Sequence, residues 1–279
     1  MNHKEFRIEV FKKAALCRHF ENKVYKLVEK KIIKIPVYLS AGQEYISASL
    51  ASIIQSSKNK PLLFPQHRCH SVYLSFGGNI VGLIDELLGR KSGCANGMGG
   101  SASIHSPEIN LYGHDGLMGS QVPISVGACF TSKKSTIVFM GDASAEEDYV
   151  FGAIGWASTK NLPIVFIIED NNLSILTEKR VRRNWEMDDV GRAFKIKSFN
   201  INDDPIEIFN NTKDLFNGPS LFNINTNRLY WHAGAGTDSP DTFDRFKEER
   251  KALGSQAEDL SEEIKNYVAL KWEQQLEKQ

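Results

Sequence analysis

The sequence lacks the features that direct a protein to nucleic acid, to a membrane or out of the cell. Its 34 Lys and Arg residues balance 34 Asp and Glu residues, so the formal net charge is zero and no strong attraction to nucleic acid is expected. No apolar run approaches the roughly 20 residues of a membrane span, and the N-terminal residues lack a signal-peptide core. We therefore expect a cytoplasmic protein with neither nucleic-acid nor membrane partners.

Cysteines are also few. Four are scattered without the spacing of a metal site or a disulfide framework, and we expect them to be reduced core or loop residues: Cys17, Cys69, Cys94 and Cys129. Internal repeats, low-complexity tracts and clear linkers are absent too, so the sequence predicts one domain over residues 1–279. Charged amphipathic helices over 4–31 and 241–275 would be its docking extensions.

Two short β-branched runs, at 136–140 and 163–168, have the composition of buried parallel strands. About one helix lies between them, with an apolar face at Phe151, Ile154 and Ala157. Such a βαβ unit places its two strands side by side in one sheet. With a short extended segment at 61–65 and two further strand candidates at 195–201 and 220–226, the pattern predicts an α/β fold in which helices flank a parallel sheet.

A polar residue follows each of the two runs. Asp142 comes after the first and Asn171 after the second, and open α/β sheets bind ligands at the carboxyl ends of their strands. A carboxylate and an amide oxygen converging there suit Mg²⁺, which in turn suits a diphosphate. The structural alternative is that Asp142 caps a helix and Asn171 belongs to a turn. This pair alone leaves both interpretations open.

Residues 89–120 hold eight of the 21 glycines. Such a segment is either a disordered linker or backbone that approaches something closely. A linker would be richer in charge and proline, whereas this segment carries apolar residues such as Ile104 and Leu111, which favours an ordered binding loop. The glycines at 97–100 lack the spacing of a dinucleotide fingerprint, which argues against a Rossmann-type nucleotide-binding protein.

Nine segments together carry a resemblance that none carries alone: Gly42-Gln43-Glu44, His67-Arg68-Cys69-His70, residues 88–94, 97–101 and 116–123, Gly141-Asp142, Asn161-Leu162-Pro163, Glu169-Asp170-Asn171 and, more loosely, residues 228–241. In order and spacing, over roughly residues 35–245, they resemble the α subunit of the E1 component of 2-oxo acid dehydrogenases. This thiamin-diphosphate (ThDP) family includes the pyruvate, branched-chain and acetoin enzymes.

The resemblance implies ligands for ThDP and Mg²⁺. Asp142 and Asn171 would hold the metal, with the backbone carbonyl of Leu173 as a third protein ligand. Arg68 and Arg228 would bind the diphosphate, because guanidinium forks match phosphate oxygens. Backbone groups would supply the remaining cofactor contacts, two of them at the start of a helix: those of Gly116, Met118, Gly141, Ala143 and Ser144.

The resemblance also implies that two histidines take part in the reaction. His232 would face the reacting carbon, and His70 would line the channel nearby. Each residue has a structural alternative, since His70 could be a packed core histidine, His232 a loop histidine, and Arg68 one half of a surface ion pair.

ThDP chemistry needs a glutamate against the pyrimidine ring of the cofactor. In the resembled family it comes from a second, pyrimidine-binding domain, for which a chain of 279 residues leaves no room. The resemblance therefore implies a partner β subunit in an α₂β₂ assembly, and the chain alone should not turn over.

Several positions depart from the family's pattern. Ala143 replaces a glycine, and changes cluster on the substrate side, where Tyr38, Ser103 and Asp115 replace histidines and His67 replaces a tyrosine. Ala233 replaces a serine, which removes a phosphorylation site. Because the cofactor ligands are kept, this pattern favours retained ThDP chemistry with an altered substrate or acceptor.

The leading hypothesis is therefore decarboxylation of a small 2-oxo acid, pyruvate first, with transfer of the acyl or aldehyde unit to a lipoyl domain or a small carbonyl acceptor. Three alternatives stay open. They are a ThDP-dependent carboligase, the N-terminal half of a split transketolase, and a non-catalytic ThDP-like subunit.

Overall fold

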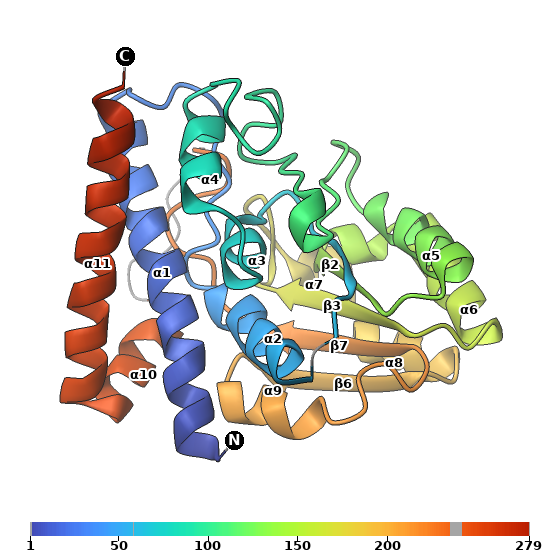
Figure 1. Ribbon diagram of the computed structural model, residues 1–279. Coiled ribbons are helices and arrows are strands. Elements are labelled where there is room, and N and C mark those ends of the chain that lie inside the picture. Colours follow the sequence, from blue (N-terminus) through green and yellow to red (C-terminus); the bar gives the residue numbers. More distant parts are fainter. Residues whose placement is uncertain (1, 58, 235–241, 279) are drawn as a thin grey trace.

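Five parallel strands form the central sheet in a computed structural model that describes residues 2–57, 59–234 and 242–278 (Figure 1). Their order across the sheet is β1-β2-β3-β7-β6. The strands are β1 (Leu62–Phe64), β2 (Thr136–Gly141), β3 (Ile164–Asp170), β6 (Lys197–Asn202) and β7 (Ser220–Asn225). β2 and β3 are direct neighbours, with Val138 opposite Phe166. The predicted α/β fold and its βαβ unit are confirmed.

Helices cover both faces of this sheet. One face carries α5 (Gln121–Ser132), α6 (Asp148–Thr159) and α8 (Met187–Ala193). The other side holds α1 (His3–Glu29), α2 (Glu44–Ser57), α3 (His70–Ser75), α4 (Ile80–Leu87) and α9 (Pro205–Asn211). The protein therefore has three layers, helix on sheet on helix.

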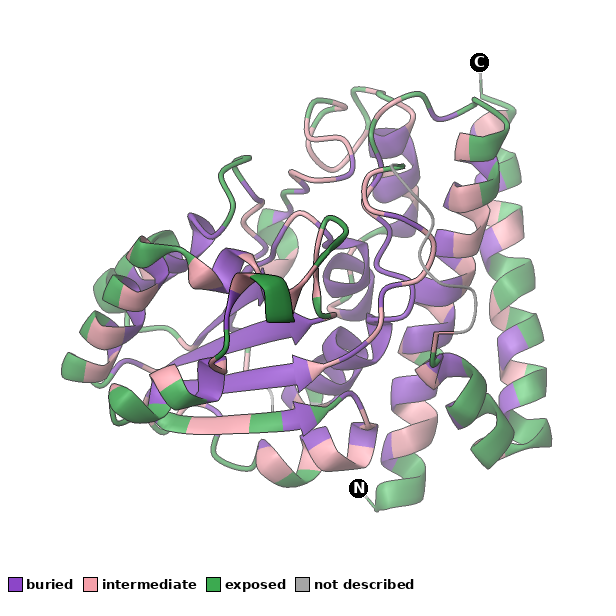
Figure 2. Cartoon of the chain, turned by 180° about the vertical axis from the view of Figure 1, so that it is seen from behind, coloured by how far each residue is buried: buried purple, intermediate pink, exposed green. Residues whose placement is uncertain are grey.

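Burial on both faces explains why the strands read as continuous apolar runs rather than as alternating ones. Ile137 and Phe139 of β2 join the core cluster on the α2 side. Val138 and Met140, which alternate with them, join the cluster beneath α5 and α6. Figure 2 shows the buried central strands beside the partly exposed edge strand β6.

The two ends of the chain form a helical layer beside the sheet. α10 (Arg245–Leu253) leads into α11 (Ser255–Leu276), which runs alongside α1 (Figure 1). The rings of Phe20 and Trp272 meet across the two helices at 5.6 Å, and both are fully buried. Helices occupy both ends of the described chain, although residue 241, where the predicted C-terminal helices begin, lies outside the described residues, and the use of these helices for docking stays a prediction. Within the described ranges, no helix is both long and apolar enough to cross a membrane.

The glycine-rich segment is ordered around Glu86, which is fully buried near the end of α4. The two oxygens of this carboxylate accept four backbone N–H hydrogen bonds of 2.7 to 3.0 Å: those of Ala95, Gly97, Gly99 and Gly100. A Cβ on Gly93 would lie 2.4 Å from Oε2 of Glu86. The segment is ordered, as expected, but the group that its glycines approach closely is Glu86 of the same chain. A 3₁₀ turn, η1 (Pro107–Ile109), follows.

Candidate cofactor site

Asp142 and Asn171 follow the adjacent strands β2 and β3 at one edge of the sheet, as predicted. A cavity of about 280 Å³ opens there. It is lined by ten of the twelve predicted site residues: Arg68, Met118, Gly141, Asp142, Ala143, Ser144, Asn171, Leu173, Arg228 and His232. Gln66, His67, Ser174 and Ile175 complete the lining. A larger hollow of about 570 Å³, next to β1 and the end of α2, is lined by different residues.

The side chain of Asn171 is held by two neighbours. Its Nδ2 donates to Oε1 of Gln43 at 2.8 Å, which fixes the orientation of the amide. Its Oδ1 accepts a hydrogen bond from the backbone N–H of Leu173 at 3.1 Å. Leu173 begins a small hairpin of β4 (Leu173–Ser174) and β5 (Thr177–Glu178), which leads into α7 (Lys179–Arg182). The amide oxygen and the Leu173 backbone are thus placed by one tight turn.

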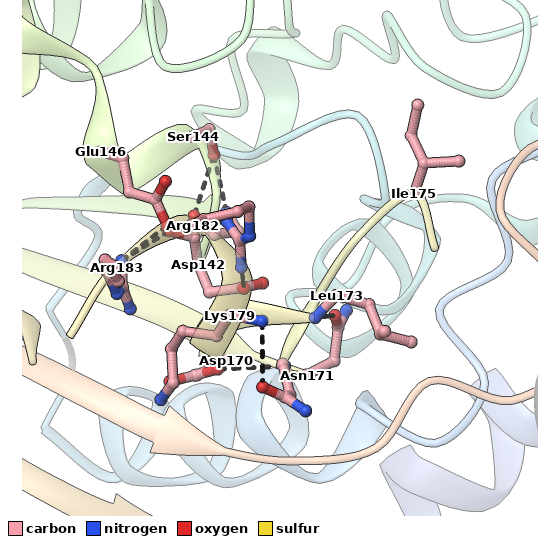
Figure 3. A network of polar contacts seen from close by, with 12 residues as sticks. Asp142, Ser144, Glu146, Asp170, Asn171, Leu173, Ile175, Lys179, Arg182 and Arg183 are labelled. Carbon is pink, nitrogen blue, oxygen red and sulfur yellow. Dashed lines mark hydrogen bonds and ion pairs between the residues drawn. The ribbon is translucent and has the colours of Figure 1, made fainter. Parts of the chain in front are cut away.

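Asp142 is almost fully buried and is paired with a cation. One of its carboxylate oxygens, Oδ2, contacts the guanidinium of Arg182 (Figure 3). Burial and the nearby carboxylate of Asp170 raise the pKa of Asp142, and Arg182 opposes both effects. A carboxylate kept out of water in this way gains from any further cation that reaches it.

The donor set at this edge suits a hard cation. A carboxylate, an amide oxygen and a backbone carbonyl are oxygen ligands of the kind that Mg²⁺ takes, with the rest of its octahedron left to substrate phosphates and water. Among the described residues there is no group of three or more His, Cys, Asp or Glu side chains arranged to hold a metal.

Two buried arginines converge at another side of the cavity. Nη2 of Arg68 lies 3.2 Å from Nδ1 of His232, and Nη1 of Arg228 lies 3.5 Å from the same nitrogen. Arg68 also donates to the backbone carbonyl of Leu39 at 2.6 Å, and Arg228 to that of Ile175 at 2.7 Å. Since a guanidinium can only donate, Nδ1 of His232 accepts and its Nε2 carries the proton. Two cations held together in one cavity suit a multiply charged anion.

Three of the predicted site residues have surroundings that differ from the expected ones. His70 lies outside the cavity, fully buried, with Nδ1 at 3.1 Å from Glu21 and Nε2 at 2.9 Å from Ser101, as the core alternative described. Gly116 also lies outside the lining, and its N–H donates to His114. Ala143 leads only into a three-residue 3₁₀ turn, η2 (Ser144–Glu146), and α6 begins at Asp148. The expected helix thus opens at Ser144 after Ala143, but it is a single 3₁₀ turn and not the start of an α-helix.

Four aromatic rings gather beside the arginines. The ring centroid of His67 lies 4.8 Å from that of Tyr38, 5.6 Å from that of His232 and 5.9 Å from that of His114. Burial and the charge of Arg68 lower the pKa of His67 to about 2. His67 is therefore neutral at any working pH and acts as a polar, uncharged wall of the cavity.

The sequence interpretation overlooked residues that support the site. Gln43 sits inside the Gly-Gln-Glu segment, and its contact with Asn171 could have been suspected from that segment alone. Arg182 and Arg183, which reach Asp142, come just after the metal-site turn. An adjacent pair of arginines so close to the turn predicted to bind the metal was the available signal.

Comparisons with known proteins identify the family of the chain. The dehydrogenase E1 component family matches residues 12–274. The chain belongs to this family. E1 dehydrogenase components are ThDP-dependent enzymes of the 2-oxo acid dehydrogenase type.

Among its relatives, the pyruvate dehydrogenase E1 component subunit alpha of Rickettsia prowazekii is 31% identical over 263 residues, which cover 88% of this chain and 79% of that subunit. The mitochondrial subunit alpha-1 of Oryza sativa subsp. japonica is 25% identical, and the match covers 87% of this chain and 65% of that protein. Both relatives are thus longer than this chain, because each match covers a smaller share of the relative than of this chain.

Solved structures of transketolases share the fold. The enzyme from Leishmania mexicana aligns over 97% of this chain and 47% of its own, with a TM-score of 0.59 and 14% identity. That from Campylobacter jejuni subsp. jejuni aligns over 100% and 49%, with a TM-score of 0.59 and 16% identity. The chain spans about half the length of each, so this likeness concerns one part of those larger enzymes.

Proposed function

We propose that the chain is the ThDP-binding α subunit of a two-subunit enzyme. The enzyme decarboxylates a small 2-oxo acid, with pyruvate as the first candidate, and passes the acyl or aldehyde unit to an acceptor. One observation carries the proposal. The oxygen donors Asp142, Asn171 and Leu173 and the cations Arg68 and Arg228 line a single cavity at the carboxyl edge of a parallel sheet.

Each group has a defined task in this proposal. Asp142, the amide oxygen of Asn171 and the carbonyl of Leu173 hold Mg²⁺, while Arg68 and Arg228 bind the diphosphate. ThDP, when bound, would supply a carbanion centre and an electron sink for the 2-oxo acid. The Nε2–H of His232 would serve as a hydrogen-bond donor, because the arginines occupy Nδ1. The neutral ring of His67 borders the same space without adding charge.

The proposed partner is a β subunit that carries the pyrimidine-binding domain, in an α₂β₂ assembly. Two facts support it. The relatives are named as alpha subunits, and the chain aligns with only about half of each transketolase. The glutamate that activates ThDP would come from that partner, so the isolated chain binds the cofactor without turning over.

The names of the relatives support pyruvate as the substrate. A lipoyl domain is the acceptor in the dehydrogenase form of this proposal. The second candidate is transfer to a small carbonyl compound, which is carboligation. It is favoured by the altered substrate side, where Tyr38 and His67 stand in contact.

Calorimetry with Mg²⁺ and ThDP tests the cofactor site. The full chain should bind ThDP only when Mg²⁺ is present. D142A and N171A should each lose this Mg²⁺-dependent binding of ThDP. Binding of ThDP by D142A as tight as by the wild type would refute the proposed metal site.

The reaction itself is tested with the partner subunit present. Pyruvate, branched 2-oxo acids and xylulose 5-phosphate are offered in turn, with a lipoyl domain or a small aldehyde as acceptor. Turnover of pyruvate supports the proposal, and turnover of xylulose 5-phosphate alone favours the split transketolase. Full activity of the isolated chain would refute the two-subunit arrangement.

A further inference from the structure

A compact ionic cluster supports Asp142 from the side of α7. Arg182 donates from Nη2 to Oδ2 of Asp142 and from Nη1 to Oε1 of Glu146, the latter at 2.7 Å. Arg183 donates to the backbone carbonyl of Asp142 at 3.0 Å and to Oε1 of Glu146 at 3.1 Å. Figure 3 shows Arg182 between the two carboxylates. The two arginines thus hold both the side chain and the backbone of Asp142.

These contacts are shielded from water. The side chains of Asp142, Arg182 and Arg183 are 2%, 13% and 1% exposed. Ion pairs at this depth are screened by salt far less than surface pairs. The ion pairs that hold the Asp142 carboxylate therefore persist at ionic strengths that weaken surface pairs.

Arg182 uses only one oxygen of Asp142. Among the described residues, none donates a hydrogen bond to Oδ1 of Asp142, while the residue itself lines the cavity. A carboxylate with one oxygen fixed by a guanidinium offers the other in a fixed direction. A metal that binds one carboxylate oxygen and demands regular geometry gains from that.

The charges in the cluster balance. Arg182 and Arg183 are matched by Asp142 and Glu146, and Glu146 accepts hydrogen bonds from both arginines. Without Glu146, two guanidiniums would place net positive charge beside the proposed metal and oppose it. With Glu146, the carboxylate is positioned without that electrostatic penalty.

We propose that Arg182 is a positioning residue for the magnesium ligand Asp142, and that Glu146 and Arg183 keep it in place. This inference rests on the proposed function, because it concerns the metal of that site. The opposite role would be competition, in which the guanidinium takes the place of the metal and must leave when Mg²⁺ binds.

The test compares R182Q with R180Q in the full chain. Arg180 lies on the same short helix, but its side chain is 79% exposed and pairs with Glu178 at the surface, so R180Q is the matched control. At saturating ThDP, calorimetry should show Mg²⁺ binding weakened about 10- to 100-fold by R182Q and unchanged by R180Q. R182K should recover part of the loss, since it restores one donor.

A second readout separates positioning from simple damage to the fold. Mg²⁺ demands near-ideal octahedral geometry, whereas Ca²⁺ tolerates irregular ligands. R182Q should therefore lose more affinity for Mg²⁺ than for Ca²⁺, while the thermal midpoint of the metal-free chain identifies any general destabilisation. Equal losses for both metals would overturn the positioning role.

The outcomes also separate this inference from the proposed function. If the wild-type chain binds no Mg²⁺ with ThDP, the proposed function fails, and this inference fails with it. If the wild type binds both and R182Q behaves like R180Q, only the positioning role is overturned. Tighter Mg²⁺ binding by R182Q would likewise overturn it, in favour of competition.

Discussion

The rings of Tyr38 and His67 meet edge to face, with centroids 4.8 Å apart, beside the cavity that His67 lines. In the E1α pattern, the first position holds a histidine and the second a tyrosine. The phenol and the imidazole are thus both kept, with their places exchanged. The two departures from the family pattern are neighbours in space.

Exchanging the two residues tests whether their effects are coupled. Y38H gives two histidines and H67Y gives two tyrosines, so each single variant should lose activity, about tenfold or more in kcat/KM. The double variant Y38H/H67Y rebuilds the pair in the family's order and should recover most of the loss, with a coupling energy of about 0.5–3 kcal/mol. The measurement is kcat/KM for the 2-oxo acid in the reconstituted two-subunit enzyme. Losses that simply add would show that the residues act independently.

His67 should make the folded state sensitive to acid. Its pKa is about 2 in the folded protein and near 6.5 in the unfolded chain. As the pH falls, His67 takes up a proton in the unfolded chain before it does so in the folded protein. The contribution of His67 to the stability of the folded state is therefore fully present above pH 6.5 and is lost as the pH falls toward 2. Between pH 7 and pH 5 the free energy of unfolding should fall by about 2 kcal/mol from this residue.

The variant H67Q isolates that contribution. Urea unfolding at several pH values should show a flatter pH dependence for H67Q than for the wild type. A constant offset between the two proteins at pH 5 and pH 7 would contradict the assignment.

Arg228 should not be replaceable by lysine. R228K keeps the charge but loses the forked donor that matches two phosphate oxygens, and it loses the hydrogen bond that Nη2 donates to the backbone carbonyl of Ile175. ThDP affinity at fixed Mg²⁺ should drop about tenfold in calorimetry. R250K on the surface of α10 is the control and should bind as the wild type does. Unchanged affinity of R228K would mean that Arg228 acts only as a point charge.

Trp272 should anchor the C-terminal helix. Its indole is fully buried against Phe20 of α1, and removal of such a side chain costs about 3–5 kcal/mol. W272A should lower the free energy of unfolding by that amount in urea titrations. L270A, on the half-exposed face of the same helix, should cost less than about 1 kcal/mol. Similar losses in both variants would argue against a single buried anchor.

The sequence predicted the sheet and most of the site because both depend on local patterns. β2 and β3 are short apolar runs, and Asp142 and Asn171 follow them directly. Because the two strands are parallel neighbours, their carboxyl ends place both residues at the same edge of the sheet. The resemblance supplied Arg68 and Arg228, which come from segments far apart in the chain.

Contacts set by packing could not be predicted in the same way. His70 belongs to a matching segment, yet it lies in the core because Glu21 of α1 and Ser101 of the glycine-rich segment both reach its ring. Arg182 reaches Asp142 only because the hairpin of β4 and β5 turns α7 back over the strand ends. Neither arrangement leaves a periodic trace in the sequence.

Glu86 has a consequence for how the chain can vary in length. Since its carboxylate holds amides at positions 95–100, an insertion or deletion between 86 and 100 would shift those amides out of reach. Ser101 follows at once, and its hydroxyl meets His70 and the backbone N–H of Tyr38, both at 2.9 Å. Length differences among related proteins should therefore fall outside this interval. A constant length between 86 and 100 keeps the position of Tyr38 fixed relative to α4.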